Sequence, residues 1–244
     1  AIRRVAVIGS GVMGAQLAAL FSGYGFQVDL FDLASTTAAP KDFIKNNLRK
    51  LKKINPTPLF SLSSLERIQP RTLEHDLQYL AEADLIIEAI AEKLEIKADL
   101  YSKISQYINT KAIIASNTSG LSIQVLSQAI AEDLRPRFLG LHFFNPPKYV
   151  PLVELIVQSD TNPEIAKEME VFLVKCLGRV VIHVKDTANF LANRLGIFAM
   201  LATDYHAQRL GLPFDIVDAL TGQIMGRPKS ATYRTIDLVG LDVF

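Results

Sequence analysis

Hydrophobic positions along most of the chain follow two alternating periods. Short apolar runs with the character of buried strands alternate with segments whose apolar residues recur at helical spacing. The strand-like runs lie near residues 5–8, 27–32, 85–89, 112–115, 137–144, 152–157 and 180–184. The helical segments lie near residues 12–24, 40–53, 92–107 and 163–177. This alternation predicts an α/β fold, a doubly wound sheet of the Rossmann type.

The pattern changes after Asp186. No strand signal follows, and helical segments run over residues 190–210 and 215–225, with a last helix and turn at 235–244. We therefore predict two domains, a sheet domain at 1–186 and an all-helical domain at 187–244. The chain stops without a closing element and has no initiator Met, so we expect the helical domain to be truncated from a longer protein.

Composition narrows the class of protein without naming a function. The chain has 244 residues, 49% hydrophobic and 21% charged, and a net charge of +1. This balance predicts a folded protein without a nucleic-acid or membrane surface. The first strand begins too close to residue 1 to leave room for a signal peptide, and no stretch approaches the ~20 apolar residues of a membrane span. The single cysteine, Cys176, fits a reducing, cytoplasmic location, and we expect it to be a buried apolar residue.

The stretch from Val5 to Gly14 carries the strongest local signal. Its glycines, Gly9, Gly11 and Gly14, have the spacing G-x-G-x-x-G between a strand and a helix. In a dinucleotide-binding turn the first glycine allows the sharp turn, the second lets a phosphate approach, and the third packs the helix against the strand. Val12 and Met13 begin that helix, whose free N–H groups face the pyrophosphate.

The acidic residue at the end of the second strand selects the dinucleotide. Asp32 follows Gly14 at the distance where a carboxylate accepts hydrogen bonds from the adenosine ribose. The next residues, Leu33, Ala34 and Ser35, include no base that would accept a 2′-phosphate. The sequence therefore predicts NAD rather than NADP.

A histidine and a carboxylate follow on two later strands. His142 and Glu154 are separated by a turn containing Pro146 and Pro147, so the two strands can bring them together. Such a pair forms a general base with its orienting anion, which oxidation of a secondary alcohol by NAD requires. By spacing alone, a structural histidine remains the more frequent alternative. The other histidines have no metal-ligand spacing, and we expect no metal.

The segment 40–53 is unusually basic. It contains Lys41, Lys45, Arg49, Lys50, Lys52 and Lys53. Such a run is most often a solvated helix face. The alternative is an electrostatic handle for a phosphorylated arm of the substrate.

Four motifs, in order, make the chain resemble the L-3-hydroxyacyl-CoA dehydrogenase family. They are the glycine turn at 9–14, Ile-Glu-Ala-Ile-Ala-Glu at 87–92, Ser-Asn-Thr-Ser at 116–119 and Gly-Leu-His-Phe-Phe-Asn-Pro at 140–146. The string at 226–235 resembles the longer bacterial members, which fuse this dehydrogenase to an enoyl-CoA hydratase. The resemblance thus implies a hydratase domain in the full-length chain, and a homodimer formed through the helical domain.

The resemblance also implies a role for individual residues. It implies that His142 is the catalytic base with Glu154 as its partner, that Ser119 bonds the reacting oxygen, and that Asn193 helps to position the substrate. The implied cofactor contacts, besides the glycine turn and Asp32, are Glu92, Lys97, Asn117 and Asn145. The implied contacts with CoA are Asn47 and Lys53. Gly120 departs from the family pattern, since many relatives carry a second serine there.

The activity implied is NAD-dependent oxidation of a (3S)-3-hydroxyacyl-CoA to a 3-oxoacyl-CoA in fatty-acid β-oxidation. Two alternatives remain open. One is a related dehydrogenase for a small free hydroxy acid, although such enzymes tend to use a lysine in place of the His–Glu pair. The other is an NAD-binding fragment or structural relative with little turnover.

Overall fold

The chain, described at residues 2–36 and 38–239 of a computed structural model, forms two compact units. The first unit comprises residues 1–190 and the second residues 191–244. The sequence prediction placed the division after Asp186. The turn predicted at the chain end lies outside the described residues, apart from the helix that precedes it.

In its described residues, 2–36 and 38–190, the first unit contains an eight-stranded sheet and five α-helices. Its strands are β1 (Arg4–Ile8), β2 (Gln27–Asp32), β3 (Ile68–Thr72), β4 (Leu85–Glu88), β5 (Ile113–Ser116), β6 (Phe138–Phe143), β7 (Leu152–Ile156) and β8 (Val180–Val184). Its helices are α1 (Val12–Gly23), α2 (Asp42–Leu51), α3 (Leu94–Ile104), α4 (Ile123–Ser127) and α5 (Pro163–Leu177). Short 3-10 helices lie at Leu62–Arg67, Leu77–Glu82, Ser105–Tyr107 and Glu132–Arg137.

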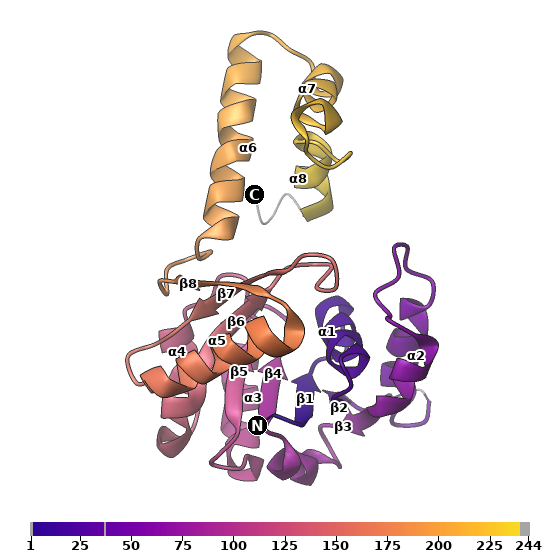
Figure 1. The fold of residues 1–244 in the computed structure, drawn as a ribbon, viewed down its shortest axis with the longest axis vertical. Helices are drawn as coiled ribbons and strands as arrows, with labels where there is room; N and C mark the ends of the chain where they lie inside the picture. Colours follow the sequence, from indigo (N-terminus) through magenta and orange to yellow (C-terminus); the bar gives the residue numbers. More distant parts are fainter. Residues whose placement is uncertain (1, 37, 240–244) are drawn as a thin grey trace. The chain divides into compact units, whose positions relative to one another are not determined.

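The sheet has the strand order β3-β2-β1-β4-β5-β6-β7-β8. All neighbouring strands are parallel except β6 and β7, which are antiparallel (Figure 1). The carboxyl ends of β1, β2, β4, β5 and β6 therefore meet at one edge of the sheet. That edge is where ligands bind in open α/β sheets.

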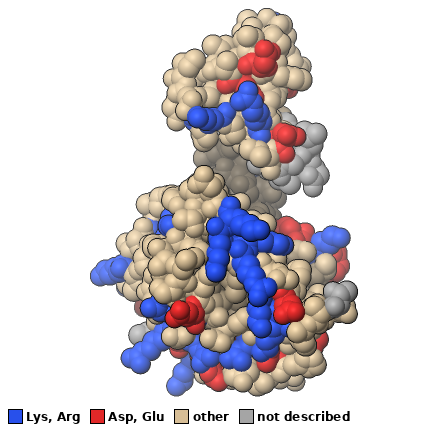
Figure 2. Space-filling model, turned by 90° about the vertical axis from the view of Figure 1, so that its right-hand side faces the viewer, with Lys and Arg blue, Asp and Glu red and all other residues tan. Residues whose placement is uncertain are grey.

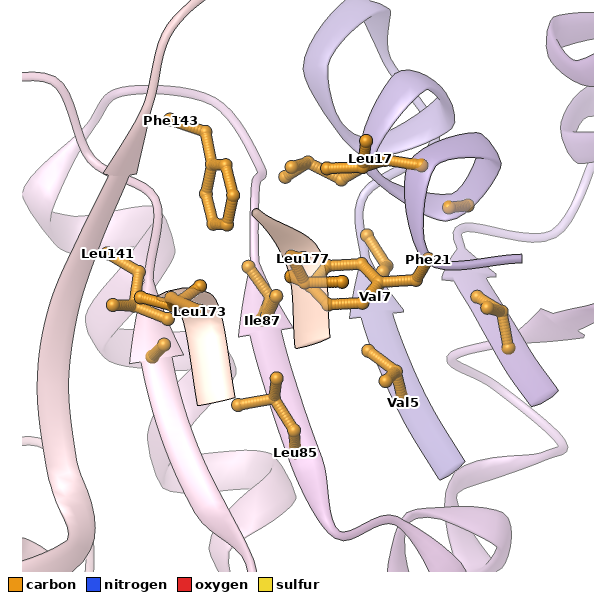
Figure 3. Packing of buried hydrophobic residues seen from close by; sticks show 14 of the residues in the cluster. Val5, Val7, Leu17, Phe21, Leu85, Ile87, Leu141, Phe143, Leu173 and Leu177 are labelled. Carbon is orange, nitrogen blue, oxygen red and sulfur yellow. The ribbon is translucent and has the colours of Figure 1, made fainter. Parts of the chain in front are cut away.

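The core lies on both faces of the sheet because successive strand residues point to opposite sides. In β1, Val5 and Val7 join the cluster beneath α1, α2 and α5, whereas Ala6 and Ile8 join the cluster beneath α3 and α4. Figure 3 shows Val7 of β1 and Ile87 of β4, which are neighbours in the register, together with Leu17 and Phe21 of α1 in the first cluster. These two covered faces confirm the predicted doubly wound architecture.

Local sequence signals explain where helix α5 begins and ends. At α5, the side chain of Asn162 accepts a hydrogen bond from the Glu164 amide (2.9 Å), and Pro163 occupies the first turn. Gly178 ends the helix in the left-handed region with φ +61°. The predicted bounds of α5 and β8 match the structure.

Two expectations about the first unit need correction. The sequence analysis did not predict β3, because Pro70 and the polar residues beside it hide an edge strand that pairs only with β2. Cys176, which we expected to be buried, is exposed. It lies on the outer side of α5, whereas Phe172 and Leu173 lie on the opposite side of this helix, which faces the core.

The second unit is helical within the described residues. It contains α6 (Ala192–Arg209), α7 (Phe214–Thr221), a 3-10 helix (Gln223–Met225) and α8 (Tyr233–Val239). Asp218 of α7 accepts a hydrogen bond from the Tyr233 amide (2.7 Å), and the Tyr233 hydroxyl donates one to Asp204 of α6 (2.8 Å). These bonds join the three helices. None of the helices described is both long and apolar enough to span a membrane.

Candidate active site

The glycine turn has the geometry that its spacing predicts. Gly9 has φ +102°, and a Cβ atom there would lie 2.6 Å from the Ala89 carbonyl oxygen. A Cβ on Gly14 would lie 1.7 Å from the Gly9 oxygen, so helix α1 can pack against the turn only with glycine there. By contrast, no described atom lies within 4 Å of a Cβ built on Gly11. Gly11 therefore faces open space at the helix N-terminus, where an anion can approach the backbone.

Asp32 lies beside this turn and is held in place by it. Its Oδ2 accepts hydrogen bonds from the Ser10 amide (2.6 Å) and the Ser10 hydroxyl (2.6 Å), and its Oδ1 accepts one from the Leu33 amide (2.7 Å). An ionised carboxylate offers about four acceptor positions. Asp32 thus keeps acceptor capacity for a sugar hydroxyl while its orientation is fixed.

A cavity of about 520 Å³ lies next to Asp32. Its walls come from the glycine turn, α2, the segment after β4, and α3, and most of its lining is apolar. The lining residues are Gly9, Gly11, Asp32, Leu33, Phe43, Leu73, Ala89, Ile90, Ala91, Ile96, Asp99, Leu100 and Lys103. Apolar walls with one fixed carboxylate suit a flat heterocycle joined to a ribose. The open Gly11, the uncapped start of α1 and this cavity together fit an adenine dinucleotide.

The turn after β5, residues 117–120, carries two of the predicted site residues, Asn117 and Ser119, and a third, Glu92, binds to it. Glu92 accepts a hydrogen bond from the Ser119 amide (2.7 Å) and another from the Thr118 hydroxyl. Asn117 Oδ1 accepts a hydrogen bond from the Phe143 backbone amide (3.0 Å), and this bond connects the turn to the end of β6. Ser119 is consequently fixed at the same edge of the sheet as His142.

His142 and Glu154 lie directly opposite each other on β6 and β7. The distance between His142 Nδ1 and Glu154 Oε2 is 2.6 Å, and both residues are buried. Because a carboxylate only accepts, Nδ1–H donates to Glu154 and leaves Nε2 as the ring nitrogen that can take a proton. The rings of Phe144 and Phe190 pack against the imidazole, with centroid distances of 4.3 and 5.8 Å.

Lys97 differs from Asp32 and Glu92, the other charged residues predicted to contact the cofactor, because it is only 1% exposed. Its Nζ lies 2.5 Å from Glu88 Oε1 and 3.3 Å from Glu92 Oε2. Asn145 is exposed, and its Oδ1 accepts a hydrogen bond from the side-chain amide of the buried Gln16, at 2.9 Å from Nε2. The structure therefore brings Glu92, Lys97, Asn117 and Ser119 into one cluster.

The basic segment forms the amphipathic helix α2. Ile44, Leu48 and Leu51 face the core, and the basic side chains lie on the outer side. Figure 2 faces this side of the first unit and shows Lys and Arg side chains gathered on it. A hollow of about 420 Å³ is lined by Phe43, Asn46, Asn47, Arg49, Lys50 and Lys53. Asn47 also donates to the Ser10 hydroxyl (3.1 Å), which links α2 to the glycine turn.

Asn193 is the remaining predicted site residue, and it lies in the first turn of α6 in the second unit. Its implied role in positioning the substrate stays a prediction. Within the described residues, no group of three or more His, Cys, Asp or Glu side chains could hold a metal ion.

Sequence reasoning missed three polar residues that contact the predicted site residues. Ser10 orients Asp32, Gln16 contacts Asn145, and Glu88 binds Lys97. Only Glu88 carried a signal, as an acidic residue within the otherwise apolar run of β4. The other two act through partners distant in the sequence, and no local pattern indicates such contacts.

Comparisons with known proteins agree with this geometry. Residues 4–187 match the family model described as the NAD binding domain of 3-hydroxyacyl-CoA dehydrogenase. A probable 3-hydroxyacyl-CoA dehydrogenase of Bacillus subtilis is 39% identical over the whole chain. A Rickettsia prowazekii protein bearing the name of a fatty acid oxidation complex trifunctional enzyme is 40% identical over 99% of it. The chain spans 33% and 34% of the lengths of these two relatives.

Solved structures show the same relationship. The crystal structure of (S)-3-hydroxybutyryl-CoA dehydrogenase from Ralstonia eutropha superposes with a TM-score of 0.82 at 28% identity, covering 100% of this chain and 84% of that one. The family match covers the sheet, the glycine turn, Asp32 and the His142–Glu154 pair. This chain belongs to the 3-hydroxyacyl-CoA dehydrogenase family and contains its NAD-binding domain.

Proposed function

We propose that the protein oxidises a (3S)-3-hydroxyacyl-CoA to the 3-oxoacyl-CoA with NAD, as a step of fatty-acid β-oxidation. The observation that carries the proposal is the buried His142–Glu154 pair at the edge of the sheet where the glycine turn and Asp32 lie. This edge joins a general base to a dinucleotide site, and oxidation of an alcohol needs both.

In the proposed reaction, His142 Nε2 takes the proton of the substrate 3-hydroxyl group. Glu154 holds the ring through Nδ1 and stabilises the imidazolium that results. When bound, NAD supplies the acceptor for the hydride that leaves C3. Ser119 then donates a hydrogen bond to the reacting oxygen, and Asn193 helps to hold the thioester arm. The fixed backbone of Ser119, bonded to Glu92, supports that assignment.

The CoA part of the substrate accounts for the basic face of α2. CoA carries phosphate groups, and the hollow lined by Asn47, Arg49, Lys50 and Lys53 offers amide and cationic donors to such groups. We assign Asn47 and Lys53 to this arm of the substrate.

The test is reduction of acetoacetyl-CoA by NADH, followed by loss of NADH absorbance, with wild-type protein and His142→Gln. Removing the base should lower kcat by about 10²- to 10⁴-fold. NADH binding, followed by fluorescence, should remain within about twofold because the glycine turn and Asp32 are unchanged. Near-normal turnover by His142→Gln would remove this pair from the mechanism.

A second comparison separates the CoA thioester from a free acid. Acetoacetyl-CoA should be reduced far more efficiently than free acetoacetate if α2 binds the CoA arm. Equal kcat/KM for the two substrates would instead favour a dehydrogenase for small hydroxy acids. Binding of NADH with no turnover of either substrate by wild type would identify an NAD-binding fragment.

Two further proposals concern the full-length protein, namely a second domain and a homodimer. The match to one third of a trifunctional relative supports an enoyl-CoA hydratase domain in the full-length chain. A stripe on α6, formed by Leu195, Phe198, Leu201 and Tyr205, is exposed and supports a homodimer through the helical unit. The mass of the full-length protein in solution, measured by light scattering, tests the dimer.

A further inference from the structure

Three ionisable residues lead from the core to the turn that carries Ser119. Glu88, at the end of β4, is fully buried, and Lys97 of α3 is 1% exposed. Glu92, between them in sequence, reaches the surface. The reaction proposed above uses none of these charges directly, and burying two of them is costly. Their position calls for a physical explanation.

Every contact of Glu88 comes from a hydrogen-bond donor. Its carboxylate accepts from Lys97 Nζ (2.5 Å), the Ile90 amide (2.8 Å), the Tyr101 hydroxyl (3.0 Å) and the Ser116 hydroxyl (2.6 Å). Four donors satisfy the acceptor positions of an ionised carboxylate. Burial and the charge of Glu88 also raise the pKa of the Tyr101 phenol well above its usual value, so Tyr101 stays a donor.

The ammonium group of Lys97 is surrounded by acceptors of the protein. It donates hydrogen bonds to Glu88 Oε1 (2.5 Å) and to the Ile90 carbonyl oxygen (3.5 Å), and it forms an ion pair with Glu92 Oε2 (3.3 Å). Of these three partners, the Glu92 carboxylate is the one that reaches the surface.

Glu92 in turn holds the turn after β5. Lys97 Nζ forms an ion pair with Oε2 (3.3 Å), while Oε1 accepts hydrogen bonds from the Ser119 amide (2.7 Å) and the Thr118 hydroxyl. Without Lys97, the Glu92 carboxylate would lose the ion pair that holds it on the side of the core. The Ser119 amide would then lose a rigid acceptor.

We infer that Glu88 and Lys97 are positioning residues for Ser119: the buried ion pair fixes Glu92, and Glu92 fixes the backbone of the Ser119 turn. The inference rests on the proposed function in assigning Ser119 to the substrate oxygen.

The physics of buried ion pairs allows a sharp test. Removing one partner leaves an uncompensated buried charge and destabilises the fold, whereas replacing both with neutral residues of similar size is often tolerated. The variant Glu88→Gln/Lys97→Met, called the neutral pair here, should therefore unfold at a higher temperature than Lys97→Met alone. In the neutral pair, Glu92 nevertheless lacks its ion pair with the Lys97 ammonium group.

The experiment compares wild type, the neutral pair, Glu92→Ala, and Glu92→Ala combined with the neutral pair. Glu92 is exposed, so we expect Glu92→Ala to keep the fold. We expect hydrogen exchange at the Ser119 amide to accelerate about tenfold in every variant. We expect kcat to fall about tenfold in each, with no further loss when the two changes are combined, because both act through Glu92.

The control is Asp29→Asn. Asp29 is buried and bonded to Arg4 (2.7 Å) and Arg71 (2.8 Å), outside the site. It should lower the unfolding temperature while leaving kcat and Ser119 exchange unchanged.

Two outcomes would overturn the inference. One is a neutral pair whose kcat and Ser119 exchange both return to within twofold of wild type, since the ion pair would then serve stability only. The other is multiplication of the two losses in the combined variant, since Lys97 would then act without Glu92. If wild type reduces no acetoacetyl-CoA, the proposed function fails, but the exchange measurements still decide the positioning role.

Discussion

Gln16 offers a prediction in which a substitution near the site increases stability. The side chain lies on α1 and is only 3% exposed. Its Nε2 donates to Asn145 Oδ1 (2.9 Å), but its Oε1 has no hydrogen-bond partner, alone among the buried side-chain polar atoms of the described residues. A buried acceptor without a donor costs about 1–3 kcal/mol, whereas a hydrogen bond to an exposed partner contributes about 0.5–1.5 kcal/mol.

Gln16→Met removes both terms with little change in size or helix propensity. The net effect should be a gain of about 1 kcal/mol, which corresponds to a rise in Tm of about 2–4 °C for a chain of this size. Thermal unfolding followed by circular dichroism measures it. The matched control is Gln158→Met, because the buried Gln158 amide has two partners, the Arg135 carbonyl oxygen (2.9 Å) and the Asp160 amide (2.8 Å). This control should lower Tm, and a lower Tm for Gln16→Met as well would refute the reasoning.

Two further predictions concern the cofactor and the second unit. Asp32→Ala should weaken NADH binding by about tenfold to a hundredfold, because hydrogen bonds to a charged acceptor are lost. It should weaken NADPH binding much less. Equal losses of affinity for the two cofactors, measured by fluorescence titration, would exclude Asp32 as the ribose ligand. Burial and the hydrogen bond to Asp204 raise the pKa of Tyr233 from 10.0 to about 12. The fold thus favours the neutral phenol, so the stability that Tyr233 adds over Tyr233→Phe is fully present below pH 10 and is lost as pH rises to about 12. The difference in free energy of unfolding between wild type and Tyr233→Phe, measured with urea, should shrink across this pH window. A constant difference would contradict the prediction.

The sequence was a good guide wherever burial is continuous. Strands such as β4 and β5 are buried on both faces, so their apolar runs mark them without ambiguity. Strand β3 lies at the sheet edge, where Gln69 and Arg71 can remain exposed or partly exposed and Pro70 needs no second neighbour. Its pairing with β2 decides its conformation, and no local pattern contains that information.

The same distinction applies to the site. Gly9, Gly14 and Asp32 could be predicted because each is required by the local geometry of a strand–turn–helix unit. Glu88 and Lys97 could not be assigned as a pair, because their contact depends on the packing of α3 beneath β4 and β5. A buried ion pair such as Glu88–Lys97 can be recognised only when the three-dimensional contacts of both side chains are known.

The cross-strand position of His142 and Glu154 has a consequence for how the chain can change over time. Glu154 is aligned with His142 on one side and with Ile182 of β8 on the other, so β7 cannot slide without breaking two ladders. A slip of one residue would turn Glu154 to the opposite face of the sheet. The distance between imidazole and carboxylate is thus set by the sheet, independently of the connecting loop 144–151. A change in the part of that loop beyond Asn145 should therefore disturb the loop's own bonds, such as the one from Arg179 to the Pro147 carbonyl oxygen (2.7 Å), before it separates the histidine from its partner.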